Sequence, residues 1–400
     1  MSALIDVASR YAAVSPRAAA PRIAELIELG AVTDDPALDP AVLVVEEVVP
    51  RIATAWEHGW QPLDLVHATR RRSSAQTARW VTRAVLAEAR RSRASERAPQ
   101  SWTEQLDALA SRRDGTEDAL LPPRGQASVA EWTTALVALD FLRHLPGSHL
   151  IDAPPSQWGR QARPRSTAGP RRGDVHDKTL TRIRALLAKA ESTEFDAEAE
   201  AFTAKAQDLM TRHAIDEAVV ADESGQSVDV RAVRVLIHHP YAVEKAGLLD
   251  VIARANRTRA VWNDFASCMT LVGVPTDLDQ VEMLFTSALV QATRAMTHAG
   301  NEPGAVGSDR SSGFRKAFLT AYALRIGARL TASAQEAAAT YGSALVPVLQ
   351  RQSEAVDAQF DHLFPHVTTG GRRTQFDARG WDAGTRAADE AVLPGGMVGS

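Results

Sequence analysis

Apolar residues recur at intervals of three and four through the first 150 residues, which predicts a domain of amphipathic helices. The best start signal is Pro21, which precedes Ile23, Leu26 and Ile27 and suits the first turn of a helix. Further helices are expected over 42–49 and 52–56 around Pro50, from Gln61 to about Arg91, over 101–110 and over 129–142. Five tryptophans lie in these 150 residues, and we expect them in the core: Trp56, Trp60, Trp80, Trp102 and Trp132.

Residues 151–176 are rich in Pro, Gly and Arg and have no apolar period, so they are expected to be a linker. The helical period returns over 177–216. Ile183, Leu186, Leu187 and Ala190 form one stripe, and a second stripe runs from Ala199 to Leu209. Two such stripes separated by a short polar turn predict a helical hairpin.

The period changes to two after residue 226, where alternating valines predict a strand with a bulge near Ala232. Strands are also expected over 258–262 and 268–274, with helices over 241–255, from Pro275, and over 314–339, 344–363 and 382–392. We therefore expect a mainly α protein: an N-terminal helical domain (1–150), the hairpin, and an α+β domain (226–400) whose small antiparallel sheet is covered by helices.

Composition is that of a globular protein, with 45% apolar residues and a net charge of −4 over 400 residues. The charge is unevenly distributed. Residues 1–66 carry 4 basic and 10 acidic side chains, whereas residues 67–97 carry 9 arginines and 2 glutamates. The chain has 40 arginines and 5 lysines. A GC-rich genome accounts for this bias, and phosphate recognition by the planar guanidinium is the functional alternative.

Basic residues at helical spacing are the candidate binding residues. Arg72, Arg79, Arg83 and Arg90 would share one face of a continuous helix and would suit a phosphate backbone. The alternative is that this face docks on the acidic first segment of the chain or on a partner protein. The remaining candidates for nucleic-acid or anion binding are Arg182, Arg184 and Lys189 in the hairpin and Arg254, Arg259, Arg315 and Arg325 in the α+β domain. Surface salt bridges are the competing interpretation of the last four.

Several classes of site lack a sequence signal. Cys268 is the only cysteine, which excludes an internal disulfide and a cysteine-based zinc finger. His238 and His239 would point to opposite faces of a strand, so no metal site is expected, and no cofactor motif is present. There is no signal peptide and no run of ~18 apolar residues, so we expect a cytoplasmic protein without a membrane partner.

The hairpin carries a family resemblance. Its first helix is similar to the pattern K-I-R-x-L-L-x-x-A and its second to E-A-x-x-A-x-x-K-A-Q-x-L-M-x-x-H. The matching residues are Ile183, Arg184, Leu186, Leu187, Ala190, Glu198, Ala199, Lys205, Ala206, Gln207, Leu209, Met210 and His213. Lys178 to Asp216 thus resembles the bacterial and phage domain of unknown function numbered 2786. The residues that follow look like the C-terminal partner domain usual in such proteins, and the layout resembles that of actinobacterial relatives. The resemblance implies a small helical module and no established catalytic residue.

These observations favour a non-enzymatic binding protein that engages nucleic acid or a partner protein. Two alternatives stay open at this point. One is a hydrolase acting on a phosphorylated or nucleic-acid substrate, which would need Arg259, Asp277 and Arg315 to converge in a pocket. The other is a structural or oligomerising protein that associates through the hairpin.

Overall fold

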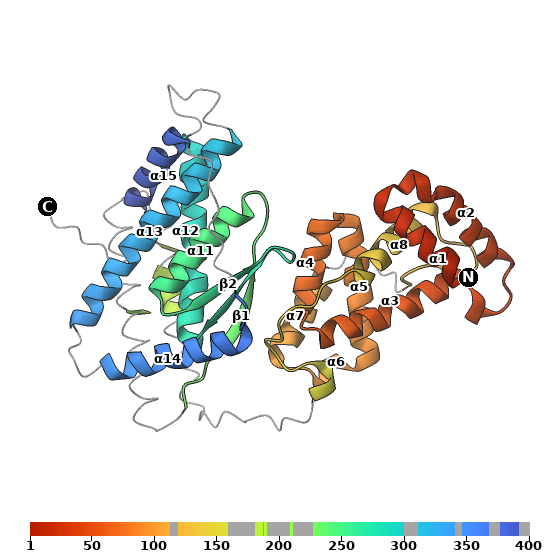
Figure 1. Cartoon of the computed structure of the whole chain (residues 1–400), viewed down its shortest axis with the longest axis horizontal. Coiled ribbons are helices and arrows are strands. Elements are labelled where there is room, and N and C mark those ends of the chain that lie inside the picture. Colours follow the sequence, from red (N-terminus) through yellow and green to blue (C-terminus); the bar gives the residue numbers. More distant parts are fainter. Residues whose placement is uncertain are drawn as a thin grey trace. The chain divides into compact units, whose positions relative to one another are not determined.

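The computed structural model describes residues 1–112, 119–158, 181–186, 188–189, 209–210, 227–299, 311–340, 346–367 and 377–391. The chain divides into two compact units, which are described separately. The N-terminal unit comprises Met1–Pro164 and Asp264–Ser267, and the C-terminal unit comprises Arg165–Asn263 and Cys268–Ser400. The fold is mainly helical with one small antiparallel sheet covered by helices, which confirms the predicted class (Figure 1).

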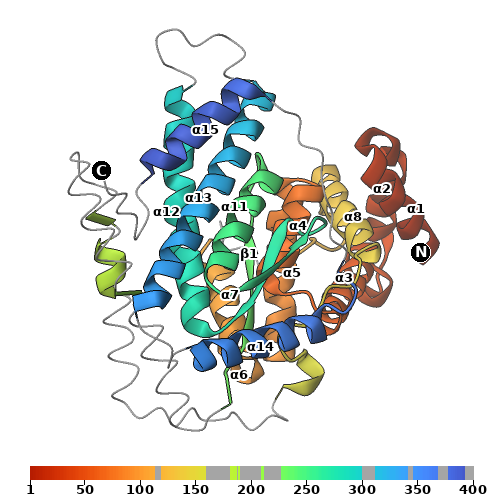
Figure 2. The same cartoon turned by 60° about the vertical axis from the view of Figure 1, so that its left-hand side comes forward.

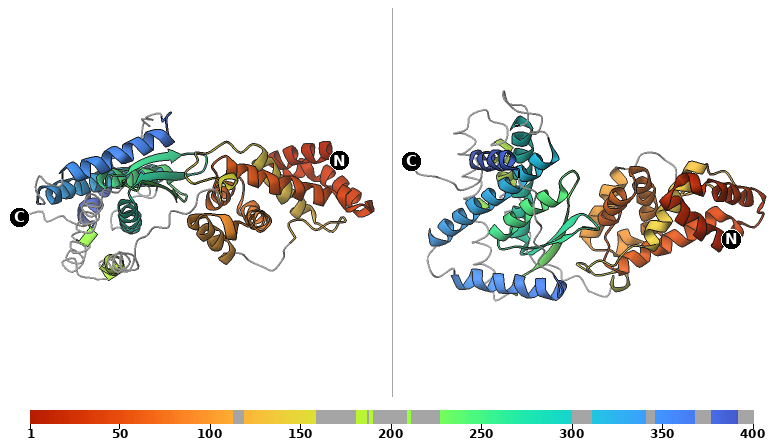
Figure 3. Two further views of the ribbon diagram at one scale, coloured as in Figure 1. Left: turned by 90° about the horizontal axis from the view of Figure 1, so that it is seen from below. Right: turned by 45° about the horizontal axis from the view of Figure 1, so that its top comes forward.

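The N-terminal unit is built from helices that begin mostly at proline or at a capping side chain. They are α1 (Ser2–Val14), α2 (Pro16–Val32), α3 (Pro40–Glu57), α4 (Pro62–Arg72), α5 (Ala75–Ser92), α6 (Ala94–Arg97), α7 (Gln100–Ser111) and α8 (Val129–Arg143), with 3-10 turns η1 (Pro36–Leu38) and η2 (Pro155–Gln157). Helix α1 packs on both α2 and α8, and these three run side by side in Figure 3. Pro50 lies inside α3, so the two apolar segments predicted around it form one helix.

Tryptophans fill the core of this unit, as predicted. Trp56, Trp60, Trp80, Trp102 and Trp132 are each at most 3% exposed. Trp56 and Trp102 meet edge to face with ring centroids 5.4 Å apart, and Trp102 meets Trp158 at the same distance. Because Trp158 is buried in this cluster, the unit continues beyond residue 150 into the segment expected to be linker.

The predicted continuous helix from Gln61 to about Arg91 is wrong. Helix α4 ends at Arg72 and α5 begins at Ala75. The reason is local: the Ser74 hydroxyl accepts a hydrogen bond from the Thr77 amide at 3.0 Å, which caps a new helix. The break separates Arg72 from the face that Arg79, Arg83 and Arg90 share, so the predicted stripe has three members on one helix instead of four.

Within the described residues, the C-terminal unit contains three strands and five helices with defined bounds, besides the helical residues 181–186. They are β1 (Arg231–Leu236), α11 (Ala242–Ala255), β2 (Arg259–Asn263), β3 (Cys268–Gly273), α12 (Pro275–Ala299), α13 (Ser312–Thr340), α14 (Val346–Leu363) and α15 (Ala378–Glu390). The predicted elements are therefore present, with α15 starting four residues early. Its start is set by Asp377, whose carboxylate accepts from the Gly380 amide at 2.9 Å.

The strands are ordered β1-β3-β2, and both pairs are antiparallel. Pairing runs without interruption from Arg231 opposite Gly273 to Leu236 opposite Cys268, so the bulge predicted near Ala232 is absent. Side chains alternate between two faces. One face packs on α11 and α12 through residues such as Leu271, and the other packs on Phe360 of α14 through residues such as Val272 (Figures 1 and 2).

Helix α15 packs very closely on α13 because small residues repeat along one side of it. A Cβ atom added at Gly380 would overlap the backbone of Phe314, and one at Gly384 would overlap the backbone of Phe318. Ala388 continues the series and is fully buried. Only glycine permits this approach of two backbones, so the C-terminal helix is a structural component of the unit.

We predict that Gly384→Ala destabilises the C-terminal unit by about 2 kcal/mol or more, because the added methyl group has no space. Gly247→Ala is the matched control. Gly247 also lies inside a helix, is exposed and has open space around its Cα, so alanine there should be neutral or stabilising by up to about 1 kcal/mol. Thermal unfolding followed by circular dichroism measures both, and equal midpoints for the two variants would contradict the packing argument.

Candidate nucleic-acid interface

Helix α5 has a buried face that fixes its rotation in the N-terminal unit. Trp80, Val81, Ala84 and Val85 are each at most 2% exposed. Glu88 lies on the same side and is 6% exposed, and its carboxylate accepts a hydrogen bond from Trp56 Nε1 at 2.7 Å. Burial raises the pKa of Glu88 above 4.5, and the Trp56 hydrogen bond opposes this shift.

Arginines occupy the opposite face of α5. Arg79 and Arg90 are both exposed, and their separation of eleven residues is about three helical turns, so they point the same way. Arg83 lies between them but is half-buried, and its guanidinium donates to the Ala119 carbonyl at 3.3 Å. Two of the three predicted arginines on this helix therefore remain exposed.

Arg72 is engaged within the unit. Its guanidinium donates to the Asp264 carbonyl at 3.2 Å and lies 4.7 Å from the ring centroid of Phe265. Both partners belong to the short segment Asp264–Ser267 of the same unit. Arg72 is therefore bound within its own unit, but to this segment and not to the acidic first segment of the chain.

The candidates chosen by helical spacing left out most of the arginines where α5 ends. Arg91, Arg93 and Arg97 are exposed, and Arg93 adopts a left-handed conformation (φ 53°) that turns the chain into α6. Together with Arg90 they place four arginines within eight residues. We call Arg79, Arg90, Arg91, Arg93 and Arg97 the arginine cluster. The nine arginines counted over residues 67–97 point to this region. Arg91, Arg93 and Arg97 were not among the candidates because they do not share the helix face of Arg79, Arg83 and Arg90.

The candidates in the C-terminal unit do not converge. Arg254 pairs with Asp250 one turn earlier on α11. Arg259 pairs with Asp357 and lies 4.3 Å from the ring centroid of Phe360. Such pairs are typical of structural surface contacts.

The other two candidates in this unit are also apart from each other. Arg325 pairs with Asp389 of α15, and Arg315 is half-buried near the start of α13. Asp277 is 3% exposed and binds Arg257, with an Nη2–Oδ1 distance of 2.6 Å. The contacts thus place Asp277 with Arg257 and Arg259 with Asp357, not in a shared pocket.

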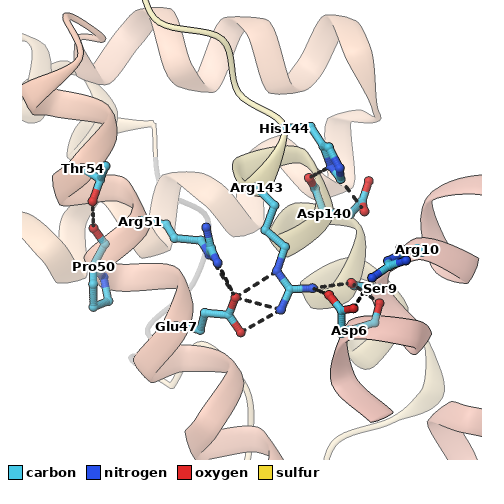
Figure 4. Close-up of polar contacts among 10 residues, drawn as sticks. All are labelled: Asp6, Ser9, Arg10, Glu47, Pro50, Arg51, Thr54, Asp140, Arg143 and His144. Carbon is cyan, nitrogen blue, oxygen red and sulfur yellow. Dashed lines mark hydrogen bonds and ion pairs between the residues drawn. The ribbon is translucent and has the colours of Figure 1, made fainter. Parts of the chain in front are cut away.

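Arg143 makes the most extensive polar network in the N-terminal unit (Figure 4). Its guanidinium binds both carboxylate oxygens of Glu47 at 2.9 Å and also donates to Asp6 and Ser9 at 2.7 and 2.9 Å. Arg51 donates to the same Glu47 at 2.8 Å. The network joins α1, α3 and α8, so this arginine stabilises helix packing and is not available to a ligand.

The first helix of the predicted hairpin presents its basic residues outward. Arg182, Arg184 and Lys189 are exposed, whereas Ile183 is buried against Met210. The Met210 carbonyl accepts a hydrogen bond from the Gln280 side chain at 2.9 Å, which attaches the segment to α12. A cavity of about 310 Å³ lies between Arg184 and residues of α12 that include Glu282.

Comparison with known proteins identifies this segment. Residues 178–217 match the family model for proteins of unknown function DUF2786. Neither the curated proteins nor the solved structures contain a match to the chain.

The DUF2786 match confirms the resemblance of this segment, which is a tenth of the chain. Most of the second helix predicted for the hairpin, and Leu187 of the first, lie outside the residues whose side chains are described. Those that are described show the DUF2786 segment packing on α12 through Ile183, Met210 and Met283.

Two further properties of the described residues bear on the site. In those parts of the chain, no group of three or more His, Cys, Asp or Glu is placed to hold a metal ion. No described helix is both long and apolar enough to cross a membrane.

The buried Glu88 carboxylate predicts a pH dependence of stability. Because its pKa is higher in the folded chain than its ordinary value of 4.5, the stability it contributes is fully present below that value and is lost as pH rises through the folded pKa. Glu88→Gln does not titrate and retains an oxygen that accepts from Trp56. We expect the variant to become more stable, relative to the natural chain, as pH rises above 4.5.

Urea unfolding of both chains, followed by tryptophan emission between about pH 4 and about pH 7, measures this difference. Titrations that the two chains share cancel in the comparison. A difference that stays constant with pH would show that Glu88 titrates alike in the folded and unfolded chains.

Proposed function

We propose that the protein is a non-enzymatic nucleic-acid-binding protein whose contact surface is the arginine cluster. One observation carries this proposal: five exposed arginines lie between residues 79 and 97 of one unit, where Glu96 and the buried Glu88 are the acidic residues. Guanidinium groups suit phosphate oxygens because they offer paired donors in a planar fork.

The charge near the cluster supports the proposal. Between residues 90 and 97, Glu96 is the only acidic residue. Glu88 lies on the buried side of α5, and the rise in its pKa weakens its ionisation. The net charge of −4 opposes binding only weakly, since charges farther than about 8 Å are screened at physiological salt. The local excess of arginine therefore governs contact with a polyanion.

An acidic partner protein is the competing partner for the same surface. The C-terminal unit gives no comparable support to the hydrolase alternative, because Arg259, Asp277 and Arg315 have separate surroundings. The proposal includes a location in the bacterial cytoplasm, where nucleic acid is accessible.

The test replaces Arg79, Arg90 and Arg97 together by Gln. These positions are exposed, and leaving Arg91 and Arg93 intact preserves the charge next to Glu88 and the left-handed turn. We expect the variant to bind a fluorescein-labelled DNA duplex on the order of tenfold more weakly at low salt, as measured by fluorescence anisotropy.

The matched control replaces Arg254, Arg315 and Arg325 by Gln, which removes the same charge from the C-terminal unit. Binding by this control should remain within about twofold of the natural chain. Unchanged urea midpoints establish that the first variant is folded. The proposal fails if no nucleic acid binds the natural chain, or if both triple variants are weakened to the same extent.

A further inference from the structure

We infer that the arginine cluster takes the phosphate backbone of a double-stranded nucleic acid, independently of sequence. This inference rests on the proposed function and names the form of nucleic acid that the surface fits. It is carried by three features: the burial of the aromatic side chains, the side chains around the cluster and the spacing of the arginines.

Proteins that bind single strands stack bases on exposed aromatic rings beside a basic groove. In the N-terminal unit the tryptophans are buried, and four of them use their indole N–H groups inside the unit. Trp56 donates to Glu88, and Trp60, Trp80 and Trp158 donate to the carbonyls of Pro146, Leu120 and Ala153. Withdrawing any of these rings to meet a base would break a buried hydrogen bond.

Tyr11 is the large aromatic residue of this unit that the structure describes as exposed, at 42%. It lies on α1, which packs on α2 and α8, and the Arg22 guanidinium covers its ring at 4.0 Å from the centroid. The described residues thus provide no stacking platform within the arginine cluster.

The cluster is also poorly suited to reading bases. Between residues 90 and 97 there is no Asn, Gln or aromatic side chain. Recognition helices present their N-terminal residues to base edges, whereas four of the five arginines lie at the C-terminal end of α5 and in α6. A cationic surface of this kind neutralises phosphates and carries little sequence information.

The spacing of the arginines favours a duplex. Arg79 and Arg90 are about 16 Å apart along α5, from a rise of about 1.5 Å per residue. A duplex presents one phosphate per about 1.7 Å of axis, counting both strands, which is twice the density of either strand alone. Arginines distributed over this length therefore meet more phosphates on a duplex.

Anisotropy titrations against a matched set of ligands test the inference. The set holds two DNA duplexes of unrelated sequence with about 20 base pairs, their separated strands, an RNA duplex of the same length, and polyglutamate. We expect the two DNA duplexes to bind within about threefold of each other and the single strands to bind at least about fivefold more weakly. The RNA duplex shows whether the surface binds DNA alone or RNA as well, and binding of either duplex supports the inference.

Salt dependence gives the second measurement. The slope of log K against log salt should be shallower by about 2 to 3 for the Arg79, Arg90 and Arg97 triple variant, close to 0.9 for each phosphate that the variant no longer neutralises. Two results would overturn the inference: single strands that bind more tightly than the duplexes, or a preference of more than about tenfold for one duplex sequence. If the triple variant still weakens binding in either case, the proposed function remains intact. Polyglutamate binding as tight as duplex binding overturns both.

Discussion

The hydrogen bond between Trp56 and Glu88, together with the buried apolar residues beside Glu88, fixes which side of α5 faces outward. A carboxylate is costly to bury unless a donor satisfies it, and the indole N–H provides that donor at 2.7 Å. Because Glu88 and its apolar neighbours must face the core, residues on the opposite side of the helix must face away from it. Arg79 and Arg90 are therefore exposed because the opposite side of α5 is buried in the core of the N-terminal unit, where Trp56 satisfies the Glu88 carboxylate.

Among the arginines that the structure describes, two physical classes bear on the site. Those between packed elements bind carboxylates or carbonyls: Arg143 joins three helices, and Arg257 forms a paired contact with a nearly inaccessible Asp277. These arginines stabilise the fold, because removing one partner of such a pair would leave a buried charge unpaired. Those at the end of α5 face outward, where positive charge is also favourable for the helix dipole. The second class is the one exposed to an external anion.

The fold was largely predictable from the sequence, because each element has its own period of apolar residues. The alternation of valines located β1, and the stripe that begins at Pro275 located α12. The break between α4 and α5 was less evident, because the capping serine that marks the boundary stands in a polar run without proline or glycine. The absence of the bulge was also hard to predict. Ala232 pairs with Val272 of β3, and this pairing does not follow from the sequence of β1 alone.

The candidate site was predictable only in part. A count of arginines located the segment 67–97, but the partners of individual arginines are set by tertiary contacts: Arg259 meets Asp357, and Arg72 meets Asp264. No spacing rule within one helix reveals such pairs. The sequence therefore predicted a basic region, and the structure was needed to show which of its arginines are exposed.

Amide hydrogen exchange of the full chain, with and without a DNA duplex, tests the central claim most directly because it locates the contact without a mutation. The account predicts slower exchange in the second half of α5 and in α6 when the duplex is present, with α11 and α13 unchanged. Protection confined to the C-terminal unit, or to the DUF2786 segment near Arg182 and Arg184, would contradict it.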